Sequence, residues 1–166
     1  EAARLRNFHE RLARHGLADR TVLYRSAGRR GEGERTWLNR SPAEAEELVR
    51  RAELLLNFHY AMAPDLLAAF RRTALVDIDP GLLQFWMSKG QLRAAPHDLY
   101  FSTGETVGTP RALFPDCGVA WTRFRPPIWL PAWPCLPAPA GGAWTTVSSW
   151  WGGLGGGEWI RSGKDE

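Results

Sequence analysis

Two aspartates at the end of an apolar run have the spacing that could support metal chemistry. Asp77 and Asp79 stand two positions apart, after the run 74–76 and before Pro80. Residues i and i+2 of a strand point to the same face, so the two carboxylates could hold Mg²⁺ or Mn²⁺ against a diphosphate. The same residues also fit a strand-to-helix junction, with Asp79 as the N-cap of a helix that begins at Pro80. We favour the cap, because the capping position, the proline and the helix agree, and a cap can still contact a polar ligand.

Other polar candidates follow two further apolar runs. His59 comes directly after the run that ends at Phe58, where it is the best-placed histidine for acid–base chemistry or hydroxyl binding. Thr103, Gly104 and Glu105 follow another run, and Gly104 would let backbone N–H groups approach a ligand. This loop is neither a Walker loop nor GxGxxG. A plain surface role stays open for both His59 and Glu105.

The remaining chemistry-bearing residues give weaker signals. His97 precedes its apolar run and so belongs to the opposite edge of a sheet, where a structural or solvated histidine is expected. No Ser/His/Asp or Cys/His arrangement follows from the spacing, and the catalytic base stays unassigned. The Trp-rich segment 129–151 could stack on sugar rings or bury a domain interface.

The elements that must position these residues alternate along the chain. An apolar stripe at Leu5, Phe8 and Leu12 predicts a first helix that ends near Gly16, and residues 27–40 are expected to be an exposed loop. Strands are predicted at 21–24, 54–58, 74–78, 98–102 and 119–121, and helices begin after Ser41 and near residues 64, 80 and 109.

This alternation indicates an α/β fold. Continuous apolar strands with short connections predict a mostly parallel sheet covered on both faces, a Rossmann-like three-layer domain. Ligands bind such sheets beyond the carboxyl ends of the strands, which draws attention to the loops after Phe58, Ile78 and Ser102.

Composition narrows the class of protein. The chain has 166 residues, of which 44% are hydrophobic and 23% charged, and its net charge is +3. The length and apolar content suit one domain with a sizeable core. The sequence shows no pattern of a nucleic-acid-binding module. Cys117 and Cys135 lack zinc-finger spacing, and a reduced, cytoplasmic chain is the plain interpretation. No apolar run reaches bilayer length. We expect an α/β domain at 1–125, a Pro/Trp-rich segment at 126–151 and a poorly ordered Gly-rich tail at 152–166.

Several blocks of the chain, between roughly residues 53 and 151, together resemble bacterial glycosyltransferases of the GT-B type. They are Asn57-Phe58, Asp77 to Gly81 with Gln84, His97 to Gly108, Trp121-Thr122, Arg125 to Ile128, Trp133-Pro134 and Trp144 to Trp150. The resemblance is to the N-terminal, acceptor-side half of such enzymes and the crossover toward the donor-side half. Since Glu1 already lies in a predicted helix, we expect the chain to be part of a longer protein, with the first strand of this half missing.

The resemblance implies transfer of a sugar from a nucleotide-sugar to an acceptor. It implies no obligatory metal and no cofactor beyond the nucleotide-sugar co-substrate, which the missing C-terminal half would bind. The expected partners are that donor and a sugar or small-molecule acceptor, without nucleic acid or a membrane span. The substrate-binding candidates are His59, Asp77, Asp79, Gln84, Thr103, Gly104 and Glu105. The isolated chain is expected to be inactive.

Two alternatives stay open. One is a metal-dependent GT-A-like transferase that uses Asp77 and Asp79 as ligands. The other is a non-catalytic Rossmann-like binding or interaction module that uses the Trp/Pro surface.

Overall fold

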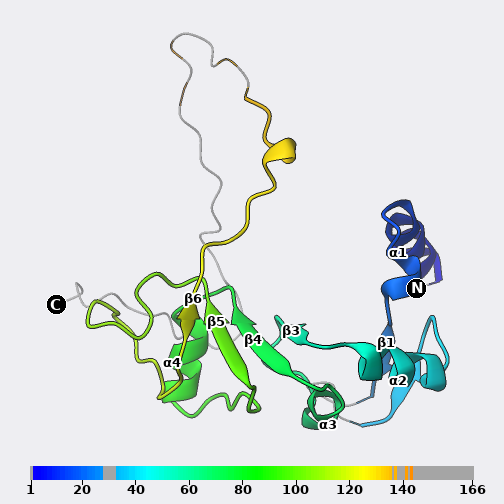
Figure 1. The fold of residues 1–166 in the computed structure, drawn as a ribbon, viewed down its shortest axis with the longest axis horizontal. Helices are drawn as coiled ribbons and strands as arrows, with labels where there is room; N and C mark the ends of the chain where they lie inside the picture. The colour runs from blue at the N-terminus through cyan, green and yellow to red at the C-terminus, as the bar shows by residue number, and fades with distance from the viewer. Residues whose placement is uncertain (1, 28–32, 136, 138–140, 142, 144–166) are drawn as a thin grey trace. The chain divides into compact units, whose positions relative to one another are not determined.

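The computed structural model describes residues 2–27, 33–135, 137, 141 and 143 of the chain (Figure 1). The chain divides into two compact units, residues 1–124 and 125–166. The first unit is an α/β domain built on a four-stranded, all-parallel sheet flanked by helices. This confirms the expected Rossmann-like α/β class.

The sheet has the strand order β3-β4-β5-β6, the same as the order along the chain. The strands are β3 (Leu55–Asn57), β4 (Thr73–Asp77), β5 (Leu99–Ser102) and β6 (Thr122–Arg123). In the register, Asp77 lies opposite Ser102, which in turn lies opposite Arg123. The carboxyl ends of the three later strands therefore meet at one edge.

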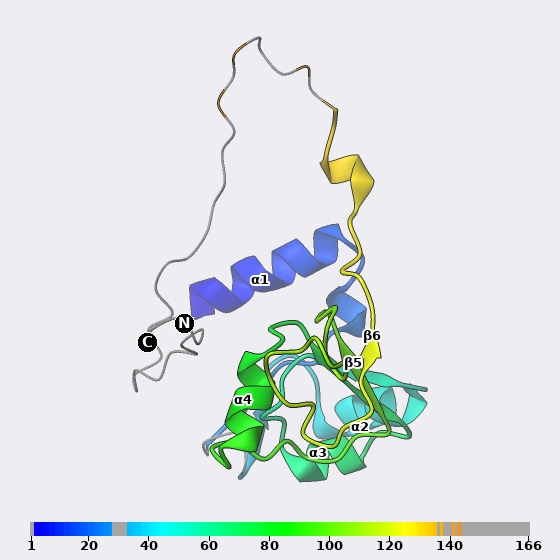
Figure 2. The same ribbon diagram turned by 90° about the vertical axis from the view of Figure 1, so that its left-hand side faces the viewer.

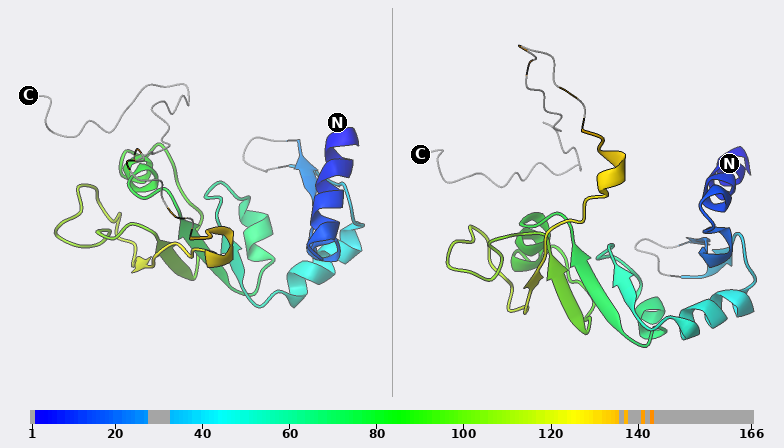
Figure 3. Two further views of the ribbon diagram at one scale, coloured as in Figure 1. Left: turned by 90° about the horizontal axis from the view of Figure 1, so that it is seen from above. Right: turned by 45° about the horizontal axis from the view of Figure 1, so that its top comes forward.

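Two short helices connect the first three strands of the sheet. Helix α3 (Pro64–Ala68) follows β3, and α4 (Leu82–Ser88) follows β4. Right-handed crossovers between neighbouring strands that advance in one direction place their helices on the same face of a sheet. Figures 2 and 3 show α3 and α4 on one side of the strands.

The two faces of the sheet differ in exposure. Residues on the face toward α4 are buried, with Asn57 and Leu75 each 1% exposed and Ser102 fully buried. On the opposite face, Ala74 and Val76 of β4 are also buried, whereas Leu56 of β3 is 51% exposed and Leu99 of β5 is 37% exposed. The buried strands that the continuous apolar runs predicted are therefore confirmed for both faces of β4, but not for Leu56 and Leu99. Apolar side chains flanking the strands are exposed as well, Phe58 and Ile78 among them.

A helix and a hairpin precede the sheet. Helix α1 (Ala2–Arg14) is followed by Gly16 with φ of +66°, as the sequence predicted. The strands β1 (Tyr24–Ser26) and β2 (Arg35–Trp37) pair antiparallel, so the prediction of a loop throughout 27–40 is wrong. A 3-10 turn, η1 (Ala18–Arg20), lies between α1 and β1.

Helix α2 (Pro42–Arg51) begins with the predicted capping box. The Ser41 N–H donates to Glu44 Oε2 at 2.8 Å, and the Glu44 N–H donates to Ser41 Oγ at 3.3 Å. The local pattern was sufficient here because both bonds join residues three positions apart.

The last part of the first unit departs from the predicted elements. The helix expected from Thr109 is replaced by turns, and the final strand lies at Thr122–Arg123 rather than 119–121. In the second unit, η3 (Leu130–Ala132) is flanked by exposed Trp129 and Trp133. The expected tail 152–166 lies outside the described residues. None of the described helices combines the length and apolar character that a membrane crossing requires.

The unequal burial of Leu75 and Leu56 predicts unequal costs for two similar truncations. Leu75→Ala should lower the free energy of unfolding by about 2–5 kcal/mol, because it opens a cavity in the core. Leu56→Ala, at an exposed position, should cost less than about 1 kcal/mol. Urea unfolding of the two variants measures the difference, and equal costs would show that another layer covers Leu56 in solution.

Candidate functional site

A buried carboxylate organises the carboxyl edge of the sheet. Asp77, only 4% exposed, accepts three hydrogen bonds within the domain. Gln84 Nε2 of α4 and Ser102 Oγ of β5 donate to Asp77 Oδ2 at 2.7 and 2.9 Å, and the Asp79 N–H donates to Oδ1 at 3.1 Å. A buried carboxylate requires such donors, because leaving it without partners costs several kcal/mol. Asp77 therefore ties β4, β5 and α4 together.

The same network fixes the loop after β5. Ser102 Oγ accepts from the Gly104 N–H at 3.1 Å, and the Thr103 N–H donates to the Asp77 carbonyl oxygen at 3.0 Å. A Cβ atom on Gly104 would lie 2.7 Å from Pro80 Cβ, so the loops after β4 and β5 pack closely and require a glycine. The structure thus brings Asp77, Gly104 and their neighbours together, as the edge argument predicted.

The helix after Asp79 begins differently from the prediction. Helix α4 starts at Leu82, with Gly81 at the cap position with φ of +99°. Its cap interaction is the Gly81 N–H donating to Gln84 Oε1 at 2.7 Å. The interpretation of Asp79 as the N-cap is therefore wrong, and the Asp79 side chain is exposed beside Pro80. Gln84 has a structural role, since its amide serves both Gly81 and Asp77.

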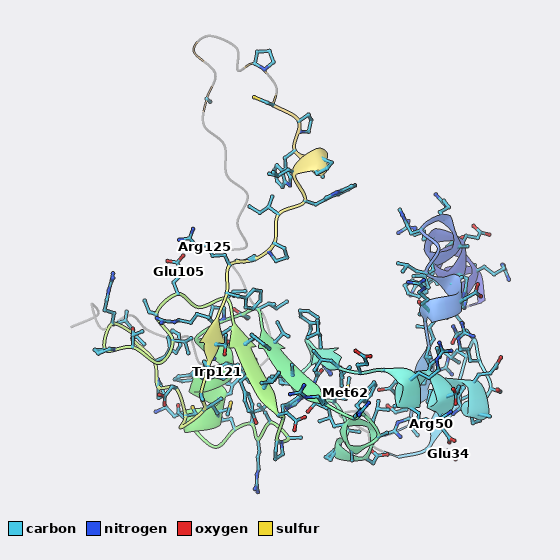
Figure 4. The ribbon with its side chains drawn as sticks, viewed as in Figure 1. Glu34, Arg50, Met62, Glu105, Trp121 and Arg125 are labelled. Atoms are coloured by element: carbon cyan, nitrogen blue, oxygen red, sulfur yellow. The ribbon has the colours of Figure 1, made fainter. Side chains whose placement is uncertain are left out.

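Glu105 and Arg123 lie at the same edge. In Figure 4, Glu105 lies beyond the tips of the strand arrows. Arg123 Nη1 donates to the Glu105 carbonyl oxygen at 3.4 Å, so a guanidinium group borders the loop after Ser102. The sequence analysis missed Arg123, whose position depends on the pairing of β6 with β5. A basic residue two positions after the last predicted strand was the only signal available.

His59 makes its contacts elsewhere. Its N–H donates to Asn57 Oδ1 at 2.9 Å, and its ring stacks on Tyr60 at 5.8 Å between centroids. Tyr60 in turn meets Trp86 of α4 edge-on. Within the described residues, His59 is thus joined to the helical side of the domain rather than to Asp79 or Glu105.

A cavity of about 280 Å³ lies beside this turn. Its lining includes Tyr60, Met62, Leu92, Arg93 and Ala95, which come from the segments after β3 and before β5. Figure 4 shows Met62 beside α3. The cavity mixes apolar walls with one guanidinium group and one phenol, and it holds none of the predicted site residues.

The arrangement of carboxylates bears on metal binding. Among the described residues, no group of three or more His, Cys, Asp or Glu side chains is placed to hold a metal ion. Asp77 directs both oxygens to protein donors, whereas Asp79 is exposed. The two aspartates therefore differ in role, one as an internal support and the other as a surface carboxylate.

Comparisons with known proteins give no relative. A scan against protein-family models, a search of curated proteins and a search of solved structures each found no match. The fold and the edge geometry define an α/β domain with polar loops at the carboxyl ends of a parallel sheet.

The role of Gln84 can be tested by one isosteric change. Gln84→Glu keeps an acceptor for Gly81 but replaces the donor to Asp77 with a second buried carboxylate. We expect a loss of at least about 2 kcal/mol of unfolding free energy at neutral pH. The loss should shrink as the pH falls toward 4, because a shared proton lets one carboxyl group donate to the other.

Chemical denaturation at several pH values measures this effect. Gln91→Glu is the matched control, because Gln91 is an exposed glutamine just beyond α4. A Gln84→Glu protein as stable as the control at neutral pH would contradict the network described above.

Proposed function

We propose that this chain is the acceptor-side half of a GT-B-type glycosyltransferase. On this proposal the complete enzyme transfers a sugar from a nucleotide-sugar to an acceptor, and a second half binds the nucleotide. The chain alone would then be inactive. The proposal joins the block resemblance to the class of fold found in the first unit.

The observation that carries the proposal is the braced carboxyl edge. Loops after β4 and β5 are held by the Asp77 network and present Asp79, Thr103 and Glu105, with Arg123 alongside. Parallel α/β sheets bind their ligands beyond this edge. Hydroxyl and carboxylate groups on a braced loop suit recognition of a polyhydroxylated acceptor, because they supply fixed donors and acceptors.

The geometry of Asp77 favours this proposal over the metal-dependent alternative. A metal pair needs two carboxylates that can turn their oxygens to one ion. Asp77 would have to give up its bonds from Gln84 and Ser102 to do so. Breaking such a buried network is costly, and no third ligand of the usual types is placed nearby among the described residues.

One observation supports a second candidate, a non-catalytic interaction module. The second unit exposes four large apolar residues, each with about 70% or more of its surface open to solvent: Ile128, Trp129, Leu130 and Trp133. Clustered exposed tryptophans are typical of surfaces that bind a partner. This candidate predicts partner binding through Trp129 and Trp133 without sugar-nucleotide chemistry.

Thermal shift against a panel of nucleotide-sugars separates these functions. The 166-residue chain and the full product of its open reading frame would each be heated with and without Mn²⁺. We expect the longer protein to be stabilised without metal, by a few degrees at saturating ligand, and the chain alone to be unchanged. A nucleotide-sugar stabilises only a folded protein that has a site to bind it. The proposal places this site outside the present chain.

Asp79→Ala is the matched variant for the metal-dependent alternative. A response of the chain alone that needs Mn²⁺ and disappears in Asp79→Ala would overturn the proposal in favour of a metal site. The interaction module would be favoured if no nucleotide-sugar shifted the melting temperature of either protein. Loss of partner binding in Trp129→Ala and Trp133→Ala would support it further.

A further inference from the structure

A buried histidine joins two segments that are distant in the sequence. His97, 9% exposed, lies before β5, and Asn57, 1% exposed, ends β3. Their side chains meet with Asn57 Nδ2 and His97 Nε2 3.0 Å apart. This contact is separate from the Asp77 network, and the predicted chemistry does not use it.

The surrounding hydrogen bonds fix which atom carries each proton. The His59 N–H donates to Asn57 Oδ1, so the amide NH₂ group of Asn57 must face His97. An amide NH₂ group only donates, so His97 Nε2 must be the acceptor. The remaining ring nitrogen, Nδ1, then carries the hydrogen and donates to the Ala95 carbonyl oxygen at 2.7 Å. The network is complete only with neutral His97 in this tautomer.

Protonation would leave this network with one donor too many. A hydrogen on Nε2 would point at the NH₂ group of Asn57. Turning the Asn57 amide over would relieve that contact, but it would set the NH₂ group against the His59 N–H. In either arrangement a buried donor loses its acceptor, which costs on the order of 1–3 kcal/mol.

Charged and titratable groups around His97 act in both directions. Burial lowers the pKa of His97, and this effect exceeds the opposing contributions of the Ala95 carbonyl and the Asp98 carboxylate. The Asp98 carboxylate accepts from the Thr73 N–H and is also near Arg72. On the β5 side, Tyr100 Oη accepts from the His97 N–H at 2.9 Å. Arg93 lies in the preceding segment, on the wall of the cavity.

The contact braces the turn that follows β3. The Met62 N–H donates to the His59 carbonyl oxygen at 3.0 Å, and the ring of Tyr60 contacts both His59 and Trp86. Tyr60 and Met62 form one wall of the 280 Å³ cavity, and Ala95 and Pro96 belong to the other segment that lines it. Asn57 and His97 therefore link the two segments that line this cavity.

We propose that Asn57 and His97 form a proton-operated latch, in which neutral His97 holds the turn 59–62 in place and protonated His97 releases it. The latch makes the shape of the cavity and the position of His59 depend on pH. It stands independently of the glycosyltransferase proposal, because it needs no substrate.

The direction of the pH effect follows from the lowered pKa. The unfolded chain binds a proton at His97 near pH 6.5, whereas the folded chain resists it. The stability that the latch contributes is therefore full above about pH 6.5 and is lost as the pH falls toward the folded pKa. Acid should loosen the turn 59–62 before the rest of the domain.

Nitrogen-15 NMR of the histidine rings in the 166-residue chain tests the latch directly. We expect His97 as the Nδ1–H tautomer at pH 7.5, and we expect the His59 amide resonance to move with the titration of His97. An Nε2–H tautomer, or a His97 ring that titrates at the ordinary histidine pKa of about 6.5, would overturn the proposal.

Two variants extend the test. Asn57→Asp keeps an acceptor for the His59 N–H and adds one for a protonated Nε2, so the midpoint of His97 titration should rise. His97→Gln can accept permanently from Asn57 and should remove the pH response. Hydrogen exchange, corrected for its intrinsic pH dependence, should show protection of residues 60–62 falling between pH 7.5 and 5.5 in the wild type and staying flat in His97→Gln. If the two proteins lose protection equally, the latch is wrong, even where Asn57→Asp fails to fold.

Discussion

The buried carboxylate of Asp77 is the constraint on which the arrangement of the sheet edge depends. A charge at 4% exposure must find donors, and three different segments supply them. Gln84 can donate only if α4 lies against the end of β4, and Ser102 only if β5 is in register with it. The Ser102 hydroxyl also accepts a hydrogen bond from the Gly104 N–H, which fixes the loop after β5. One side chain thus couples helix position, strand register and loop conformation.

The sheet topology explains why one face has this organisation and the other does not. Strand order equals chain order, so successive crossovers place α3 and α4 on the side of Asp77. On the other face, Ala74 and Val76 of β4 are buried, whereas Leu56 of β3 and Leu99 of β5 are exposed. A strand whose residues are apolar on both faces is typical of a sheet that is covered on both sides. The sequence of β3 to β5 is therefore consistent with a further layer over Leu56.

The features that the sequence predicted correctly depend on contacts between residues close together in the chain, and the features that it missed depend on distant ones. The capping box at Ser41 and the end of α1 at Gly16 were predicted correctly, because their partners lie within a few residues. The cap at Asp79 was wrong because the helix begins two residues later than predicted, after Gly81 with φ of +99°, and the Asp79 N–H is held instead by Asp77 Oδ1. Strand β2 was missed because its pairing partner lies across a polar, Gly-rich stretch. Contacts such as Asn57 with His97 require the strand register, which no local pattern contains.

The two buried polar ties of the domain differ in their response to protons. The Asp77 network uses a side-chain amide, a hydroxyl group and a backbone N–H as donors, none of which titrates near neutral pH. The tie between Asn57 and His97 uses an imidazole as its acceptor, and imidazole is the side chain whose charge changes in that range. The donors that hold the loops after β4 and β5 therefore keep their protons through that range, whereas the turn after β3 depends on one proton. A domain built this way keeps one part of its strand-end surface rigid while the neighbouring part responds to its surroundings.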